Sequence, residues 1–159
     1  MNYRFTLNLA GATPATEDFE DKLFEAGCDD APVCFYGNNP YLEFSREAES
    51  AHAAITSAMT SVHAAGYQVV SIEEAGLVTL TGAAHHANTS KQALNHYAKG
   101  TRGPGGFPAP CYGLQSGTPL YRWSAIAAWL VQHGKAGADL AEVATAAEQI
   151  TATLRQASA

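Results

Sequence analysis

The residues best suited to metal binding or nucleophilic chemistry in this chain are three cysteines with irregular spacing. Cys28, Cys34 and Cys111 are odd in number, and no two of them form a C-x-x-C pair. This pattern argues against a disulfide framework and against a zinc site of the usual spacing. We expect buried thiols that behave as small hydrophobic side chains. The alternative is a site assembled from Cys28, Cys34 and distant histidines.

Other residues capable of catalysis are equally scattered. His52 and His63 are expected on one face of one helix, where solvated or packed histidines are commoner than metal ligands. No nucleophile–base pair, paired carboxylate or metal-ligand cluster occurs at a usable spacing. The glycines at 103, 105 and 106 are not followed by Lys-Ser or Lys-Thr and lie outside any βαβ unit, which argues against a nucleotide-binding loop. We therefore predict a protein that is not an enzyme and that has no cofactor and no metal.

The segment TLTGAAHHANTSKQALNHYAKG, residues 79–100, predicts a helix-turn-helix. A small residue in the first helix allows a close approach of the second, and Ala84 supplies it. Four residues later, Asn88 stands where the turn requires a residue that tolerates positive φ. Leu94 would plug the space between the two helices.

The outward face of the second helix is polar and carries no acid. If that helix begins at Thr89 or Ser90 and ends at Lys99, its outward residues are Ser90, Lys91, Gln92, Asn95, His96 and Lys99. Lysine and serine reach phosphates or guanine, whereas glutamine and asparagine pair with adenine. The alternative is an ordinary solvated helix face. The absence of carboxylates favours DNA.

Charge divides the chain into two unlike parts. The net charge is −6 overall. Residues 1–78 carry twelve acidic and three basic side chains, whereas residues 79–138 carry five basic side chains and no acidic one. A stretch of sixty residues without a carboxylate suits a surface that faces phosphates.

The elements that position these residues begin with an α+β domain over residues 1–75. Alternating apolar residues predict strands, and apolar stripes at helical spacing predict helices, the first of them capped by Thr16. The expected elements are a strand at 3–9, a helix at 16–27, a hairpin at 33–44, a helix at 50–65 and a strand at 67–72. The order β-α-β-β-α-β is that of a ferredoxin-like fold. Such a domain could act as a sensor or bind a partner. We favour the alternative that it helps the protein to pair with itself.

The remaining chain predicts a winged helix-turn-helix over residues 76–134 and a C-terminal amphipathic helix over 138–157. A hairpin between Cys111–Leu114 and Leu120–Trp123 would form the wing, and Ser124 would cap the next helix. In the last helix, Leu140, Val143, Ala147, Ile150 and Leu154 recur at coiled-coil spacing. This seam suits pairing with a second chain or docking onto the chain's own body.

The sequence GTRGPGGFPAP, followed by PLYRW and AAWL, resembles a group of small bacterial DNA-binding proteins of actinobacterial type. Their winged heads are related to those of phage excisionases and MerR-type regulators. The resemblance covers about Val78–Leu130, with weaker similarity in FEAGCDD. This chain departs from the group at His85-His86-Ala87 and Lys91, where more arginine and a glycine near the turn are expected.

The resemblance implies that the second helix enters the major groove and that the wing lies against the DNA backbone. Base reading then falls to Ser90, Lys91, Gln92, Asn95 and His96, with Thr89 beside them. Phosphate contacts fall to Lys99, Arg102 and Arg122.

We therefore predict a cytoplasmic, sequence-specific double-stranded DNA-binding protein, repressor-like and dimeric. No stretch is apolar enough to span a membrane and the N-terminus lacks a secretory signal pattern. The alternative is a protein-interaction module, antitoxin-like or a recombination accessory factor, whose acidic half binds a protein partner.

Overall fold

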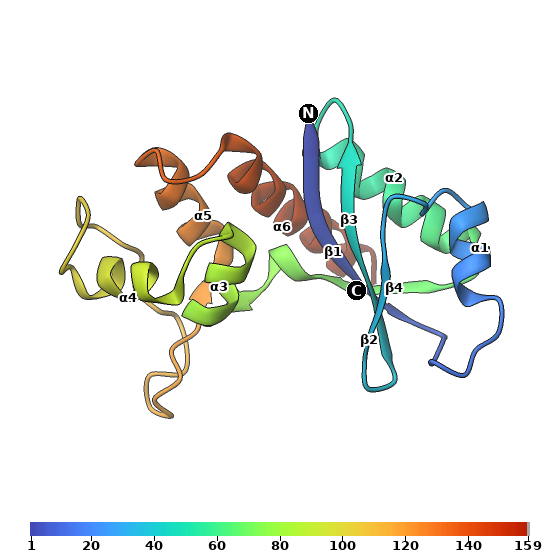
Figure 1. Cartoon of the computed structure of the whole chain (residues 1–159), viewed down its shortest axis with the longest axis horizontal. Helices are drawn as coiled ribbons and strands as arrows, with labels where there is room; N and C mark the ends of the chain where they lie inside the picture. Colours follow the sequence, from blue (N-terminus) through green and yellow to red (C-terminus); the bar gives the residue numbers. More distant parts are fainter. Residues whose placement is uncertain (159) are drawn as a thin grey trace.

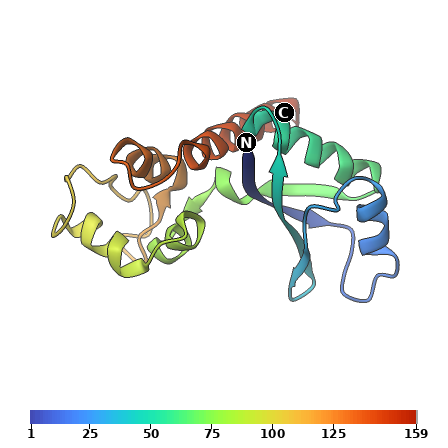
Figure 2. The same cartoon turned by 45° about the horizontal axis from the view of Figure 1, so that its top comes forward.

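A computed structural model describes residues 1–158 as a mixed α+β structure. The chain is elongated, with an antiparallel sheet and its helices at one end and a group of shorter helices at the other (Figure 1). A view turned by 45° shows the last helix running along the molecule and connecting the two ends (Figure 2). None of the helices in residues 1–158 combines the length and apolar character needed to cross a membrane.

The sheet contains four strands in the order β2-β3-β1-β4, all antiparallel. They are β1 (Asn2–Ala10), β2 (Val33–Tyr36), β3 (Asn39–Glu47) and β4 (Gln68–Ile72). Alternation along β1 places Tyr3, Phe5, Leu7 and Leu9 on the buried face, as the sequence predicts. A bulge between Asn8 and Leu9 shifts the pairing with β4.

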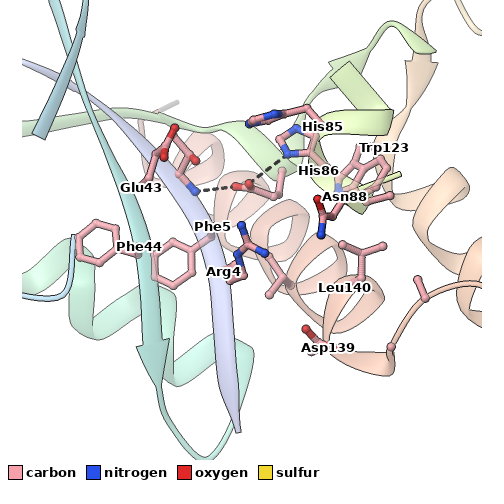
Figure 3. A pocket seen from close by; sticks show the side chains of 16 residues that line it. Arg4, Phe5, Glu43, Phe44, His85, His86, Asn88, Trp123, Asp139 and Leu140 are labelled. Atoms are coloured by element: carbon pink, nitrogen blue, oxygen red, sulfur yellow. Dashed lines mark hydrogen bonds and ion pairs between the residues drawn. The ribbon is translucent and has the colours of Figure 1, made fainter. Parts of the chain in front are cut away.

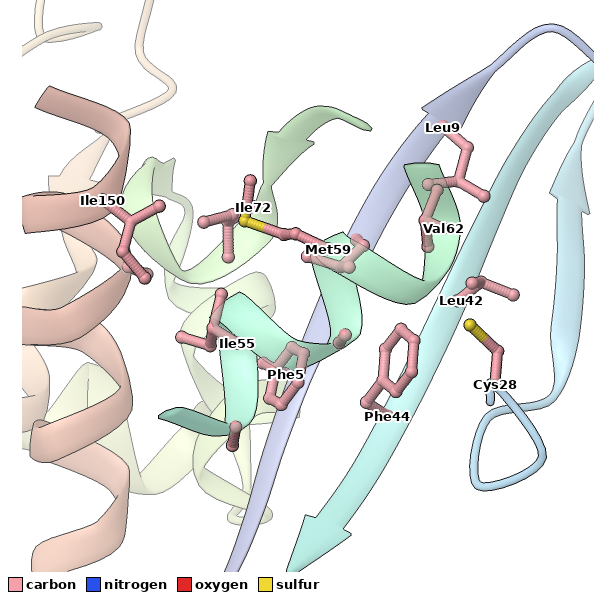
Figure 4. Close-up of a cluster of buried hydrophobic side chains, with 14 of the residues drawn as sticks. Phe5, Leu9, Cys28, Leu42, Phe44, Ile55, Met59, Val62, Ile72 and Ile150 are labelled. Atoms are coloured by element: carbon pink, nitrogen blue, oxygen red, sulfur yellow. The ribbon is translucent and has the colours of Figure 1, made fainter. Parts of the chain in front are cut away.

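The buried face of the sheet is covered by α1 (Phe19–Glu25), α2 (Ala51–Ala64) and part of α6 (Ala138–Ser158). Side chains from β1, β3 and α2 interdigitate beneath these helices, together with Ile150 of α6 (Figure 4). The rings of Phe5 and Phe44 stack with centroids 5.1 Å apart. Within residues 1–158, no helix is layered over the other face of the sheet (Figure 1).

The short helices form a second hydrophobic cluster. It is built from β5 (Leu77–Val78), α3 (Leu80–Ala87), α4 (Lys91–Lys99), β6 (Tyr121–Arg122) and α5 (Trp123–Gln132), and η1 (Glu73–Ala75) connects it to the sheet. Trp123, Ile126 and Leu94 are fully buried there. Two apolar clusters within one chain agree with the two-part charge pattern of the sequence.

Helix α6 packs against both clusters. Val143, Ala147 and Ile150 are buried with the sheet, whereas Ala144 is buried with α5. The Glu142 carboxylate also accepts a hydrogen bond from the Ala51 N–H at the start of α2, at 2.8 Å. Val143, Ala147 and Ile150 of the α6 seam therefore dock onto the chain's own body, one of the two interpretations of that seam, whereas Leu154 is 45 % exposed.

Three local expectations from the sequence are wrong. Helix α1 begins at Phe19, and the Thr16 hydroxyl instead accepts a hydrogen bond from the Thr13 N–H. Residues 111–114 form no strand beyond a single bridge between Tyr112 and Leu120, and β6 pairs with β5. Ser124 does not cap α5, which begins one residue earlier. Its hydroxyl donates to Glu148 instead.

Candidate nucleic-acid interface

Helix α3 is defined by a cap at each end. The Thr79 hydroxyl accepts a hydrogen bond from the Gly82 N–H at 3.1 Å and so begins the helix. Asn88 ends it in the left-handed conformation, with φ 53° and ψ 47°. The Thr89 N–H then bonds to the Ala84 carbonyl at 3.0 Å, which satisfies one of the open carbonyls of the last turn. The positive φ expected at Asn88 is thereby confirmed.

Helix α4 is set against α3 by one apolar side chain. Leu94 is fully buried, while Ala93 and Tyr97 are half-buried on the same side. Gly100 ends the helix in the left-handed conformation with φ 75°. Burial on this side leaves the opposite face of α4 at the end of the molecule farthest from the sheet (Figure 1).

Most of the predicted DNA-contacting residues are exposed together on this outer end. They are Thr89, Ser90, Lys91, Gln92, Lys99 and Arg102, whereas Asn95 and His96 are half-buried. No acidic residue lies between Thr79 and Ala138, so none interrupts the surface of α4 or of the loop after it. The outer face of α4 is thus polar and cationic.

Two predicted base-reading residues already have local partners. The Ser90 hydroxyl accepts a hydrogen bond from the Ala93 N–H at 3.1 Å and caps α4. The His96 Nδ1 lies 2.9 Å from the Thr101 hydroxyl. Ser90 is therefore the N-cap of α4, and a contact between its oxygen and a base would compete with this cap.

The glycine-rich loop after α4 is held by aromatic side chains. Trp129 Nε1 donates to the Gly105 carbonyl at 3.0 Å, and the Trp129 ring contacts those of Tyr97 and Phe107. A Cβ on Gly103 would lie 2.9 Å from the Tyr97 ring, so only glycine fits there. The motif GTRGPGGFPAP thus anchors the loop and leaves Arg102 exposed.

Arg122 is engaged within the chain. Its Nε donates to Glu148 Oε1 at 3.0 Å and its terminal nitrogen to Oε2 at 2.5 Å. Burial opposes the ionisation of Glu148, but the hydrogen bonds from Arg122 and Ser124 outweigh it and lower the pKa of Glu148. The Arg122 side chain is exposed, but a phosphate there would have to share or displace this carboxylate.

The junction between the two clusters contains a polar group that the sequence did not reveal. Glu74 is 6 % exposed; its Oε1 accepts from the Thr6 N–H at 2.9 Å, and its Oε2 lies 3.5 Å from His86 Nδ1 (Figure 3). Burial raises the pKa of Glu74 to about 7, and burial lowers the pKa of His86. In sequence Glu73-Glu74 is indistinguishable from a solvated acidic pair, because its partner Thr6 lies 68 residues away.

The cysteines and histidines expected to have structural roles are spread apart. Cys28 is buried as expected, Cys34 is half-buried and Cys111 is exposed, which corrects the expectation for Cys111. His52 and His63 are exposed on α2. In residues 1–158 no three histidine, cysteine or acidic side chains come together as a metal site.

No protein-family model, no curated protein and no solved structure matches this chain.

Proposed function

We propose that this protein binds double-stranded DNA sequence-specifically through α4 and acts as a dimeric, repressor-like transcriptional regulator. The observation that carries the proposal is the outer face of α4. That face presents Lys91, Gln92 and Lys99, is free of acidic residues, and is joined to α3 by a tight turn at Asn88. This is the arrangement by which a recognition helix presents its N-terminal residues to the major groove.

The proposal includes a winged helix-turn-helix and a ferredoxin-like domain. The pair α3–α4, the β5–β6 pairing and the 111–120 loop correspond to a winged helix-turn-helix. The strand order β2-β3-β1-β4 with α1 and α2 on one face agrees with a ferredoxin-like domain. In this arrangement the 111–120 loop is the wing, and its tip carries no charged side chain.

Within the interface, Lys91 and Gln92 read base edges from the start of α4, and Lys99 and Arg102 neutralise phosphates. Two phosphate contacts per protomer amount to about four for a dimer. The logarithm of the binding constant should then fall with the logarithm of salt concentration with a slope of about −4. A monomer making two such contacts would give about −2.

The test is fluorescence anisotropy of the full chain with a random-sequence duplex pool, measured across salt concentrations. Lys99→Ala should weaken binding and flatten the slope by about 2 units for a dimer. Lys22→Ala, an exposed lysine on α1, is the matched control and should change neither quantity. A Lys99→Ala slope equal to that of the wild type, or no binding at low salt, would refute the proposal.

Sequence specificity is tested separately by selecting bound duplexes from the random pool. The wild type should enrich a two-fold symmetric site whose halves are about one helical turn apart. Lys91→Ala should enrich a more degenerate site, because it removes a side chain that contacts a base edge. Enrichment of no sequence by the wild type would leave only non-specific DNA binding.

A further inference from the structure

A groove of about 890 Å³ lies between the open face of the sheet and α3. The sheet contributes residues from β1, β3 and β4, including Asn8, Tyr41 and Val70. The β2–β3 hairpin contributes Tyr36, and α3 contributes Thr81 and His85. The volume is within the range of sites for small organic molecules. The acidic part of the chain, residues 1–78, lines one side of the groove, and α3 from the acid-free part lines the other.

The charge of the groove has one sign. Its lining includes the carboxylates of Glu43 and Glu73 and no lysine or arginine. Arg4 lines the smaller adjoining pocket, which Figure 3 shows, but it does not line the groove. Burial lowers the pKa of His86 and so disfavours its charged form. The groove therefore attracts cations.

The two carboxylates differ in their availability. Glu73 accepts a hydrogen bond from the Asn8 side-chain amide at 2.8 Å. The Glu43 side chain is exposed, and among residues 1–158 no hydrogen bond or ion pair to its carboxylate is present. Figure 3 shows Glu43 of the sheet and His85 of α3 on facing sides of the junction. Glu43 is thus the acceptor left for a ligand.

The same groove exposes apolar surface to solvent. The Tyr36 side chain is 81 % exposed and Val70 is 64 % exposed, although both are large hydrophobic residues. Exposed apolar side chains that gather in one concave place mark binding sites more often than chance. Tyrosine rings beside carboxylates form the usual environment for an organic cation, which gains from both the ring quadrupole and the negative charge.

We propose that this groove binds a hydrophobic organic cation, with Glu43 as its counter-ion and Tyr36 and Tyr41 against its apolar body. The binding requires no DNA, so its failure would leave the DNA-binding proposal unaffected.

The experiment is isothermal titration calorimetry of the full chain with two probes of the same shape and opposite charge, tetraphenylphosphonium and tetraphenylborate, in sodium buffer. Tetraphenylphosphonium should bind one per chain with a dissociation constant below about 100 µM, and at least tenfold more tightly than tetraphenylborate. Equal affinities of the two probes would mean that the surface binds apolar molecules without regard to their charge, and would overturn the proposal. So would no binding of the cation at millimolar concentration.

Variants locate the site. Glu43→Gln keeps the shape of the side chain and should weaken tetraphenylphosphonium binding about two- to fivefold, because it removes one charge interaction at an exposed position. Tyr36→Ala should weaken it about two- to fivefold. Glu25→Gln on α1, an exposed carboxylate outside the groove, is the control and should bind as the wild type does. Unchanged affinity in Glu43→Gln would place the probe elsewhere and refute the assignment.

Discussion

Replacing Glu74 by glutamine should stabilise the protein at alkaline pH and leave it almost unchanged at pH 5. Glutamine keeps an oxygen that can accept from the Thr6 N–H and an amide that can donate to His86 Nδ1. It removes only the ability of the side chain to ionise. Ionisation of this side chain costs free energy in the folded state, because the side chain is buried between the sheet and α3.

The magnitude follows from the raised pKa of Glu74. Burial moves it from 4.5 to about 7. The folded state therefore keeps a proton that the unfolded chain releases, and this contribution to stability falls as the pH rises from 4.5 to 7. Above pH 7 the loss is complete and amounts to about 3 kcal/mol, since each pKa unit corresponds to about 1.4 kcal/mol. His86, whose pKa is lowered, acts with the opposite sign. Because His86 contacts the replaced side chain, the same comparison in a His86→Gln background separates its contribution from that of Glu74.

The assay is urea unfolding followed by the fluorescence of the two tryptophans, at pH 5 and at pH 8. The free-energy advantage of Glu74→Gln should be small at pH 5 and should grow by about 2 to 3 kcal/mol at pH 8. Glu25→Gln should show no such growth. An advantage that is the same at both pH values would show that the Glu74 carboxylate is not held in a low-dielectric environment, and would refute the raised pKa.

Three other substitutions test particular contacts. Asn88→Val should lower the free energy of unfolding, measured by urea titration, by about 2 kcal/mol, because a β-branched residue is strained at positive φ. The control Asn88→Gly should change it by less than about 0.5 kcal/mol. Ile150→Asp should cost about 3 to 5 kcal/mol by the same measurement, and the exposed neighbour Gln149→Asp on α6 should cost less than about 1 kcal/mol. Gly113→Ala should open the 111–120 loop, since the new Cβ would lie 1.9 Å from the Thr118 carbonyl oxygen. Faster hydrogen exchange of the Thr118 amide, which donates to the Gly113 carbonyl, would report it, and unchanged protection would contradict it.

Local patterns in the sequence predicted the elements well. The alternation along β1 and the apolar stripe of α2 depend only on which side of an element is buried, so the α+β class and the order of the first elements are confirmed. Asn88 is equally local, because few residues other than glycine tolerate the left-handed conformation. The exposure of Lys91 and Lys99 follows from the periodicity of α4.

The missed features depend on residues that are distant in sequence. Arg122 looked like a phosphate ligand because Glu148, 26 residues away, was not known to lie beside it. The strand partner of β6 is β5, a segment more than 40 residues earlier in the chain, whereas residues 111–114 contribute only the bridge between Tyr112 and Leu120. The groove combines the sheet with α3, and no single segment carries its signature.

Helix α6 has a consequence for how the protein is made. The ribosome releases β1 first, yet part of the hydrophobic cover of its sheet comes from Val143, Ala147 and Ile150. The sheet therefore cannot complete its core during translation until α6 has left the exit tunnel. Until then its apolar surface depends on α1 and α2 alone, which is the situation in which nascent chains are most exposed to aggregation and to chaperones. Because α6 also packs on α5, both ends of the molecule should become fully stable at the same late moment.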